Sequence, residues 1–193
     1  MGYKTFVSAI DIAKEIMKKY IKSGYIALDC TVGNGNDTIL LAHLVGKEGK
    51  VYGFDIQSIA IEITKEKLMK QGLEDRVILI NDSHEFIDKY ILQKLDFVIY
   101  NLGYLPKGNK QIITKAASTL ASLKKALSLL KNNGLILVTC YTGHKGGIEE
   151  WLAVKNYFES LDQKEFNVLE FNFINQKNNP PILYGVEKKD RRV

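Results

Sequence analysis

Hydrophobic and polar positions alternate along the chain with two periods, one typical of strands and one typical of helices. Short apolar runs predict strands at residues 25–29, 51–55, 77–81, 95–101, 135–141, 166–175 and 182–188. Apolar residues at the spacing of an amphipathic helix predict helices at residues 7–21, 38–45, 57–71, 83–90, 112–131 and 147–160. Asn132, Asn133 and Gly134 are interpreted as the stop of the long helix. Each strand except the last two is therefore followed by a helix.

Strands that alternate with helices predict right-handed crossovers and a parallel sheet with helices on both faces. Only residues 176–181, QKNNPP, separate the last two predicted strands. A parallel connection needs a dozen or more residues, so these two strands must be antiparallel. We predict a single α/β domain over residues 1–193, with a mostly parallel seven-stranded sheet and an antiparallel last strand.

Composition and charge agree with a globular domain and exclude some classes of protein. Hydrophobic residues make up 46% of the chain and charged residues 25%, which permits a sizeable core. No apolar run is long enough to span a bilayer, and the N-terminus lacks the apolar core of a signal peptide. Cys30 and Cys140 are isolated and suit neither a disulfide framework nor a metal site, so we expect a reducing cytoplasm. The net charge of +5 permits a polyanionic partner such as RNA without requiring one.

The loop after the first strand, DCTVGNGNDT (residues 29–38), is a candidate cofactor site. Ligands of open α/β sheets bind at the carboxyl ends of the strands. Gly33 and Gly35 allow the backbone to approach a ligand, and the next helix begins with unpaired N–H groups. Thr38 stands where a dinucleotide fingerprint has its third glycine, and Asp29 suits a cationic or amino-bearing ligand better than a pyrophosphate. A tight turn without a ligand is the alternative.

Polar residues also end the second and third predicted strands. Asp55 stands where an acidic residue accepts hydrogen bonds from ribose hydroxyls. Asp82, Ser83 and His84 can reach an adenine edge. Taken singly, Asp55, Asp82 and Ser83 fit helix caps equally well, and His84 fits a packed histidine. Their register on successive strands favours a nucleotide-type cofactor.

Blocks of sequence along nearly the whole chain resemble the class I S-adenosylmethionine-dependent methyltransferases, a Rossmann-like fold, and more closely their rRNA methylase family. The blocks are DCTVGNGNDT, FDIQ, NDSHE, YNLGYLPKGNK, YTGHKGGIEE and NNPPIL. That family includes bacterial tRNA methyltransferases that methylate the amine of 5-aminomethyl-2-thiouridine at the wobble position. The resemblance implies S-adenosylmethionine as the cofactor. It implies cofactor contacts at Asp29, Asn34, Gly35, Asn36, Asp55, Gln57, Ser83 and His84. The neighbouring motif residues Thr31, Gly33, Asp37, Ile56 and Asp82 complete the predicted site.

The end of the fourth strand is the candidate acceptor site. In N-methyltransferases of this fold, an Asn/Asp-Pro-Pro-aromatic motif binds the amino group that is methylated. Asn101 and Tyr104 keep the two end positions of that motif, while Leu102 and Gly103 replace the prolines. The alternative is an Asx-type turn in which Tyr104 only packs.

An alkyl amine is largely protonated at neutral pH, so its lone pair must be freed before it can attack. Asn101 cannot act as a base, whereas Asp29 can stabilise nearby charge and His144 is a candidate proton acceptor. His144 fits loop packing or an RNA phosphate contact equally well. Lys107, Lys110 and Lys145 flank the predicted mouth and suit phosphates, with a solvated lysine face as the alternative.

The leading hypothesis is a cytoplasmic tRNA methyltransferase that acts on the wobble uridine and contacts the anticodon arm. The expected partners include no membrane and no metal, and a homodimer is compatible with the chain. A methyltransferase acting on rRNA or on a small amine is the second hypothesis. A catalytically idle RNA-binding domain that retains the fold is a third, from a different class.

Overall fold

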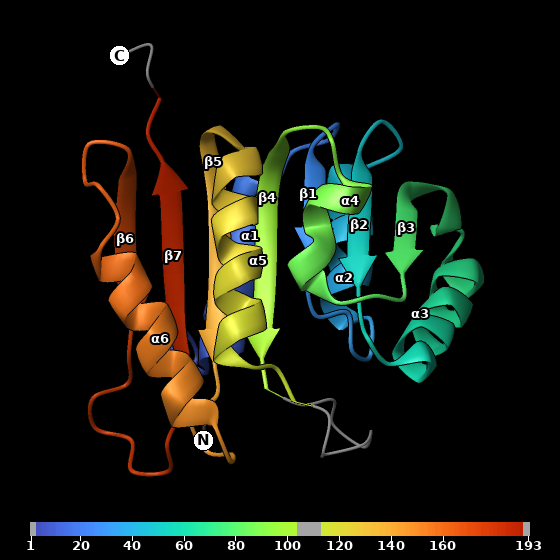
Figure 1. Ribbon diagram of the computed structural model, residues 1–193. Helices are drawn as coiled ribbons and strands as arrows, with labels where there is room; N and C mark the ends of the chain where they lie inside the picture. Colours follow the sequence, from blue (N-terminus) through green and yellow to red (C-terminus); the bar gives the residue numbers. More distant parts are fainter. Residues whose placement is uncertain (1–2, 104–112, 191–193) are drawn as a thin grey trace.

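The computed structural model describes residues 3–103 and 113–190, which form a seven-stranded sheet with helices on both faces (Figure 1). The strand order is β3-β2-β1-β4-β5-β7-β6. The strands are β1 (Ile26–Asp29), β2 (Lys50–Phe54), β3 (Val77–Ile80), β4 (Leu95–Leu102), β5 (Leu130–Cys140), β6 (Phe166–Phe171) and β7 (Ile182–Lys188). The helices are α1 (Ala9–Tyr20), α2 (Asn36–Val45), α3 (Ser58–Gln71), α4 (Ile87–Tyr90), α5 (Ala116–Leu129) and α6 (Gly147–Glu159). Two short 3-10 helices are η1 (Glu74–Arg76) and η2 (His84–Phe86).

The pairing of the strands confirms the predicted α/β topology. β1 pairs in parallel with both β2 and β4, and the parallel arrangement continues to β3 on one side and β5 on the other. β7 is antiparallel to both of its neighbours, β5 and β6. The strand order reverses between β1 and β4, because β1 leads outward to β2 and β4 leads outward to β5. This switch point is where a ligand site is expected.

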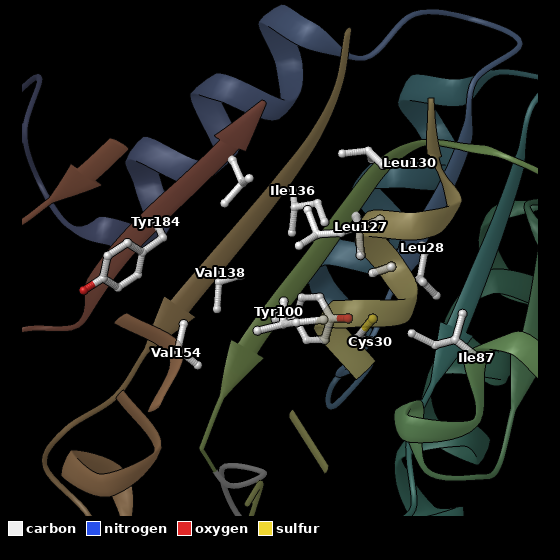
Figure 2. Packing of buried hydrophobic residues seen from close by; sticks show 14 of the residues in the cluster. Leu28, Cys30, Ile87, Tyr100, Leu127, Leu130, Ile136, Val138, Val154 and Tyr184 are labelled. Carbon is white, nitrogen blue, oxygen red and sulfur yellow. The ribbon is translucent and has the colours of Figure 1, made fainter. Parts of the chain in front are cut away.

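The two faces of the sheet are covered by different helices. Figure 1 shows α4, α5 and α6 in front of the sheet and α1 and α2 behind it. Helices cover both faces of the sheet, so β4 is buried on both sides. Its residues 97–100 therefore form a continuous apolar run, although their side chains alternate between the faces. Val98 and Tyr100 pack in the front layer, as Figure 2 shows for Tyr100, whereas Phe97 and Ile99 pack in the rear layer.

The predicted helix over residues 112–131 is shorter in the structure, and its predicted stop is wrong. α5 ends at Leu129 and β5 begins at the next residue. Asn132, Asn133 and Gly134 instead lie inside β5, where the register with β4 shifts. Asn133 has a φ of 59°, a left-handed conformation that asparagine tolerates and that suits a bulge. The predicted strand over residues 166–175 also ends early, at Phe171.

A buried hydroxyl pair lies between β4 and α5. The fully buried Tyr100 hydroxyl lies 2.7 Å from Ser122 Oγ. The Cys30 thiol lies beside the Tyr100 hydroxyl (Figure 2). Burial raises the pKa of that thiol well above its ordinary value. A thiol is a weak hydrogen-bonding group, so the two hydroxyls satisfy each other.

Tyr100→Phe should therefore destabilise the protein by about 1–3 kcal/mol, because it leaves the Ser122 hydroxyl in an apolar layer without its partner. Urea denaturation measures this change. The double variant Tyr100→Phe/Ser122→Ala should cost clearly less than the sum of the two single variants, because it removes both polar groups together. Additive costs would show that the pair does not stabilise the fold.

Candidate active site

A cavity of about 390 Å³ opens at the carboxyl ends of the central strands. Its wall contains most of the residues predicted from the first three strand ends, together with Asn101 from the fourth. They are Thr31, Gly33, Asn34, Asn36, Asp37, Asp55, Ile56, Gln57, Asp82, Ser83, His84 and Asn101. Asp29 and Gly35, which were also predicted to contact the cofactor, are not among the lining residues. The structure therefore brings most of the predicted polar groups to one cavity, whereas Asp29 and Gly35 belong to the same loop but do not line it.

The loop after β1 is held by glycine geometry and by Asp29. Gly35 has a φ of 77° at the start of α2, and a Cβ atom there would lie 2.5 Å from Thr64 Oγ1, so only glycine fits. Asp29 is completely buried. Its carboxylate accepts hydrogen bonds from the Thr31 N–H (3.0 Å) and the Thr38 hydroxyl (2.6 Å). Asp29 thus stabilises the conformation of the loop without lining the cavity.

Burial, and after it the negative charge of Asp37, raise the pKa of Asp29 to about 7, although the hydrogen bonds from Thr38 and Thr31 act in the opposite direction. The pKa of Asp55 is also raised by burial. Burial is the largest cause of both shifts, so these carboxyl groups lie in a poorly solvated part of the molecule, where their ionised forms are disfavoured.

Asp55 connects the first loop to the end of β2. One carboxylate oxygen accepts from the Gly33 N–H (2.8 Å) and the other from the Gln57 N–H (2.9 Å). A carboxylate has about four lone-pair sites, so Asp55 can accept further hydrogen bonds from ribose hydroxyls while it holds the loop.

The third strand end contributes a cap and a neutral histidine. Ser83 Oγ accepts from the Glu85 N–H at 3.3 Å, so Ser83 caps η2 as well as lining the cavity. His84 is 8% exposed, and its ring packs edge-on against Tyr100 with centroids 5.8 Å apart. Burial lowers the pKa of His84 to about 4, so its ring is neutral at neutral pH. Nδ1 is buried and has no hydrogen-bond partner within residues 3–103 and 113–190.

Asn101, the second-last residue of β4, makes two hydrogen bonds with the first loop and the start of α2. Its backbone N–H donates to Thr31 Oγ1 (2.8 Å), and its side-chain Nδ2 donates to Asp37 Oδ2 (2.7 Å). With Nδ2 used in this way, the amide oxygen is the group of Asn101 that can accept from a ligand. The predicted acceptor residue and the predicted cofactor loop are therefore in direct contact.

Of the other residues predicted near the acceptor, Tyr104, Lys107 and Lys110 lie outside the described residues. His144 lies against the end of β4, since a Cβ atom on Gly103 would be 3.6 Å from its Nε2. Its Nδ1 is 3.0 Å from the Lys145 carbonyl oxygen. His144 is not among the cavity-lining residues, and Lys145 is exposed beside it. Their predicted roles remain predictions.

Sequence reasoning missed several lining residues, which come from three other segments. They are Ile10 and Lys14 of α1, Ile113, Thr114 and Ser118 around the start of α5, and Tyr141 after β5. The rule that ligands meet strand ends could have found Tyr141. The place of α1 beside the cavity depends on tertiary packing that no local pattern encodes.

Glu150 is a second missed group. It is 2% exposed, and its carboxylate accepts from the Thr114 and Thr119 hydroxyls, each at 2.6 Å. It joins the start of α5 to α6 behind the cavity. Its position predicts a structural role in holding Thr114 at the cavity wall.

The carboxylates around the cavity fit S-adenosylmethionine, which carries positive charge on its sulfonium and its amine. Asp37, Asp55 and Asp82 line the cavity and Asp29 lies behind it, whereas Lys14 is the one lysine that lines it among residues 3–103 and 113–190. Apolar side chains of Ile10, Val32, Ile56 and Leu102 are available for an adenine ring.

Within the described part of the chain, no group of His, Cys, Asp or Glu could hold a metal ion. No helix there is both long enough and apolar enough to cross a membrane.

Comparisons with known proteins agree with this interpretation. Residues 51–187 match the family model described as "Putative rRNA methylase". The chain is 34% identical to the chloroplastic tRNA (mnm5s2U34)-methyltransferase of Arabidopsis thaliana over 94% of this chain and 70% of that one. A "putative rRNA-methylase" structure from Clostridium thermocellum superposes with a TM-score of 0.92 at 44% identity, covering 97% and 100% of the two chains. A Streptococcus mutans methyltransferase in complex with SAH gives a TM-score of 0.85 at 37% identity, covering 97% and 99%.

The class I methyltransferase fold and the S-adenosylmethionine cofactor are confirmed. The chain belongs to the rRNA methylase family of S-adenosylmethionine-dependent methyltransferases.

The buried position of Asp29 predicts a pH dependence of stability. The pKa of Asp29 is about 7 in the folded state and near its ordinary 3.8 in the unfolded state, so the folded state binds the proton more tightly between these values. The free energy of unfolding should then fall as pH rises, by at most about 1.4 kcal/mol per pH unit for one such group.

Asp29→Asn removes the titrating group, and the amide can still pair with Thr31 and Thr38. Urea denaturation of the ligand-free variant between about pH 4 and about pH 7 should show a flatter profile than that of the unaltered protein. An unchanged slope would mean that Asp29 does not titrate in this range. Asp75→Asn, which alters an exposed carboxylate, is the control.

Proposed function

We propose that this protein transfers the methyl group of S-adenosylmethionine to the amine of 5-aminomethyl-(2-thio)uridine at the wobble position of tRNA. The product is 5-methylaminomethyl-(2-thio)uridine. The observation that carries the proposal is the position of Asn101 at the end of β4, hydrogen-bonded to Asp37 within an acid-lined cavity. The tRNA substrate is supported by the name of the Arabidopsis relative, a tRNA (mnm5s2U34)-methyltransferase.

The chemistry of the wall suits an amine. An ammonium group is attracted by the carboxylates around the cavity, and an amine N–H can donate to the Asn101 amide oxygen. A methyl transfer of this kind depends mainly on bringing the two reactants together in line. When bound, S-adenosylmethionine supplies the methyl group on a sulfonium sulfur.

We assign the chain's own residues to three tasks. Asp55, Ser83 and His84 hold the nucleoside part of the cofactor, and the loop of residues 31–36 holds its charged part. Asn101 orients the acceptor nitrogen. His144 and Lys145 lie beside the mouth, where RNA phosphates would approach a chain of net charge +5. An rRNA acceptor, which the family description names, is the alternative.

Nucleoside mass spectrometry tests the proposal. Total tRNA from a strain that lacks the gene should accumulate 5-aminomethyl-2-thiouridine and lose its methylated form. The purified protein with S-adenosylmethionine should restore the methyl group on that tRNA and leave rRNA from the same strain unmethylated. An unchanged tRNA profile, or methylation of the rRNA alone, would overturn the tRNA assignment.

Asn101→Ala should lower turnover by about 100-fold or more while SAH affinity, measured by calorimetry, changes little, because the amide acts on the acceptor during transfer. The exposed Asn156 of α6 provides a matched control as Asn156→Ala, which should keep normal rates. Normal turnover by Asn101→Ala would remove Asn101 from the acceptor site.

A further inference from the structure

The strongest unassigned feature of the site is the carboxylate of Asp37. Asp37 lies in the first turn of α2, where a carboxylate commonly serves only to stabilise the helix N-terminus. Here the carboxylate instead accepts a hydrogen bond from the side chain of Asn101 on β4 at 2.7 Å. Its other oxygen, Oδ1, makes no hydrogen bond with any residue in the described ranges 3–103 and 113–190. Asp37 thus faces the cavity at the point where the cofactor loop meets the acceptor strand.

The proton acceptors considered from the sequence are placed less well than Asp37. Asp29 is 0% exposed, lies outside the cavity wall, and uses its oxygens on Thr31 and Thr38. His144 lies beside Gly103 but does not line the cavity. Asp37 lines it and shares a hydrogen bond with Asn101, the residue assigned to the acceptor nitrogen.

Within the described residues, the titratable and polar groups around Asp37 come from four segments. Lys14 projects from α1, Asn101 from β4, Tyr141 follows β5, and Asp29 ends β1. Burial raises the pKa of Asp37, while the Asn101 hydrogen bond and the charge of Lys14 act in the opposite direction. The charge of Asp37 in turn contributes to the raised pKa values of Tyr141 and Asp29. A carboxylate with a raised pKa is a stronger base than an ordinary one.

We propose that Asp37 is the group that binds the protonated acceptor amine and takes its proton. This inference rests on the proposed function. One N–H proton of the substrate ammonium passes to the Asp37 carboxylate, and the freed nitrogen lone pair forms the new N–CH3 bond. The C–S bond breaks with its electron pair left on sulfur. The product leaves as a secondary ammonium, and Asp37 then loses its proton to water.

Asp37→Asn tests this role with little change of shape, because the asparagine oxygen can still accept from Asn101 Nδ2. With Asp37 present, the protonated amine is productive, so the rate should be nearly constant between the pKa values of Asp37 and of the amine. Without it, only the neutral amine reacts. The variant should lose about 100-fold or more in kcat/KM near neutral pH, and its rate should rise about tenfold per pH unit toward the pKa of the amine.

A binding measurement gives a second readout. With SAH present, the unaltered protein should prefer an anticodon stem-loop carrying 5-aminomethyluridine over one carrying 5-hydroxymethyluridine. Asp37→Asn should lose that preference while it keeps normal SAH affinity. The smaller variant Asp37→Ala should regain activity with added formate, whose carboxylate can occupy the vacated space. Glu149→Gln, which alters an exposed first-turn carboxylate of α6, is the control and should behave normally.

The outcomes separate the two levels of the proposal. If the unaltered protein methylates the aminomethyl stem-loop, but Asp37→Asn keeps its rate and its flat pH profile, the role of Asp37 is overturned and the proposed function stands. If the unaltered protein neither binds nor methylates that stem-loop, the proposed function fails and the role of Asp37 fails with it. A selective loss of rate and of amine preference supports both.

Discussion

The parallel pairing of β1 with β4 is the constraint on which the site depends. Ala27, Leu28 and Asp29 lie beside Phe97, Val98 and Ile99, so the two strands deliver their carboxyl ends to the same edge of the sheet. The contact continues beyond the ladder through the Asn101 N–H and the Thr31 hydroxyl. The predicted cofactor loop and the predicted acceptor strand are therefore positioned by the same backbone register that forms the core, and a shift of that register would separate them.

The concentration of carboxylates at this edge has an energetic consequence. Burial raises the pKa of Asp29, Asp37 and Asp55, which means that their ionised forms are less stable in the ligand-free fold than in water. A cationic ligand would offset that cost, because its charge replaces the lost solvation. Relief of this unfavourable electrostatic free energy would then contribute to the binding of such a ligand.

Much of the fold could be predicted from the sequence, because the strands of β1 to β5 are apolar runs separated by helices with regular spacing. The glycines of the first loop and the acids at the strand ends also predicted the part of the cavity wall that follows β1, β2 and β3. The bulge at Asn133 could not be predicted, because an Asn-Asn-Gly sequence fits a helix stop equally well and only the register with β4 decides between them. The bond between Asp37 and Asn101 joins residues 64 positions apart, so it exists only after the sheet has formed.

The two cysteines have a consequence for work on the protein in solution. Cys30 and Cys140 are each 1% exposed, and burial raises the pKa of both thiols well above the ordinary value. The thiolate is the reactive form, so both native cysteines should be nearly inert toward alkylating reagents while the fold is intact. A single cysteine introduced on the surface could then carry a crosslinker or a fluorophore without removal of either native thiol. Distances from the surface to a ligand in the cavity could be mapped from such positions in the otherwise unaltered protein.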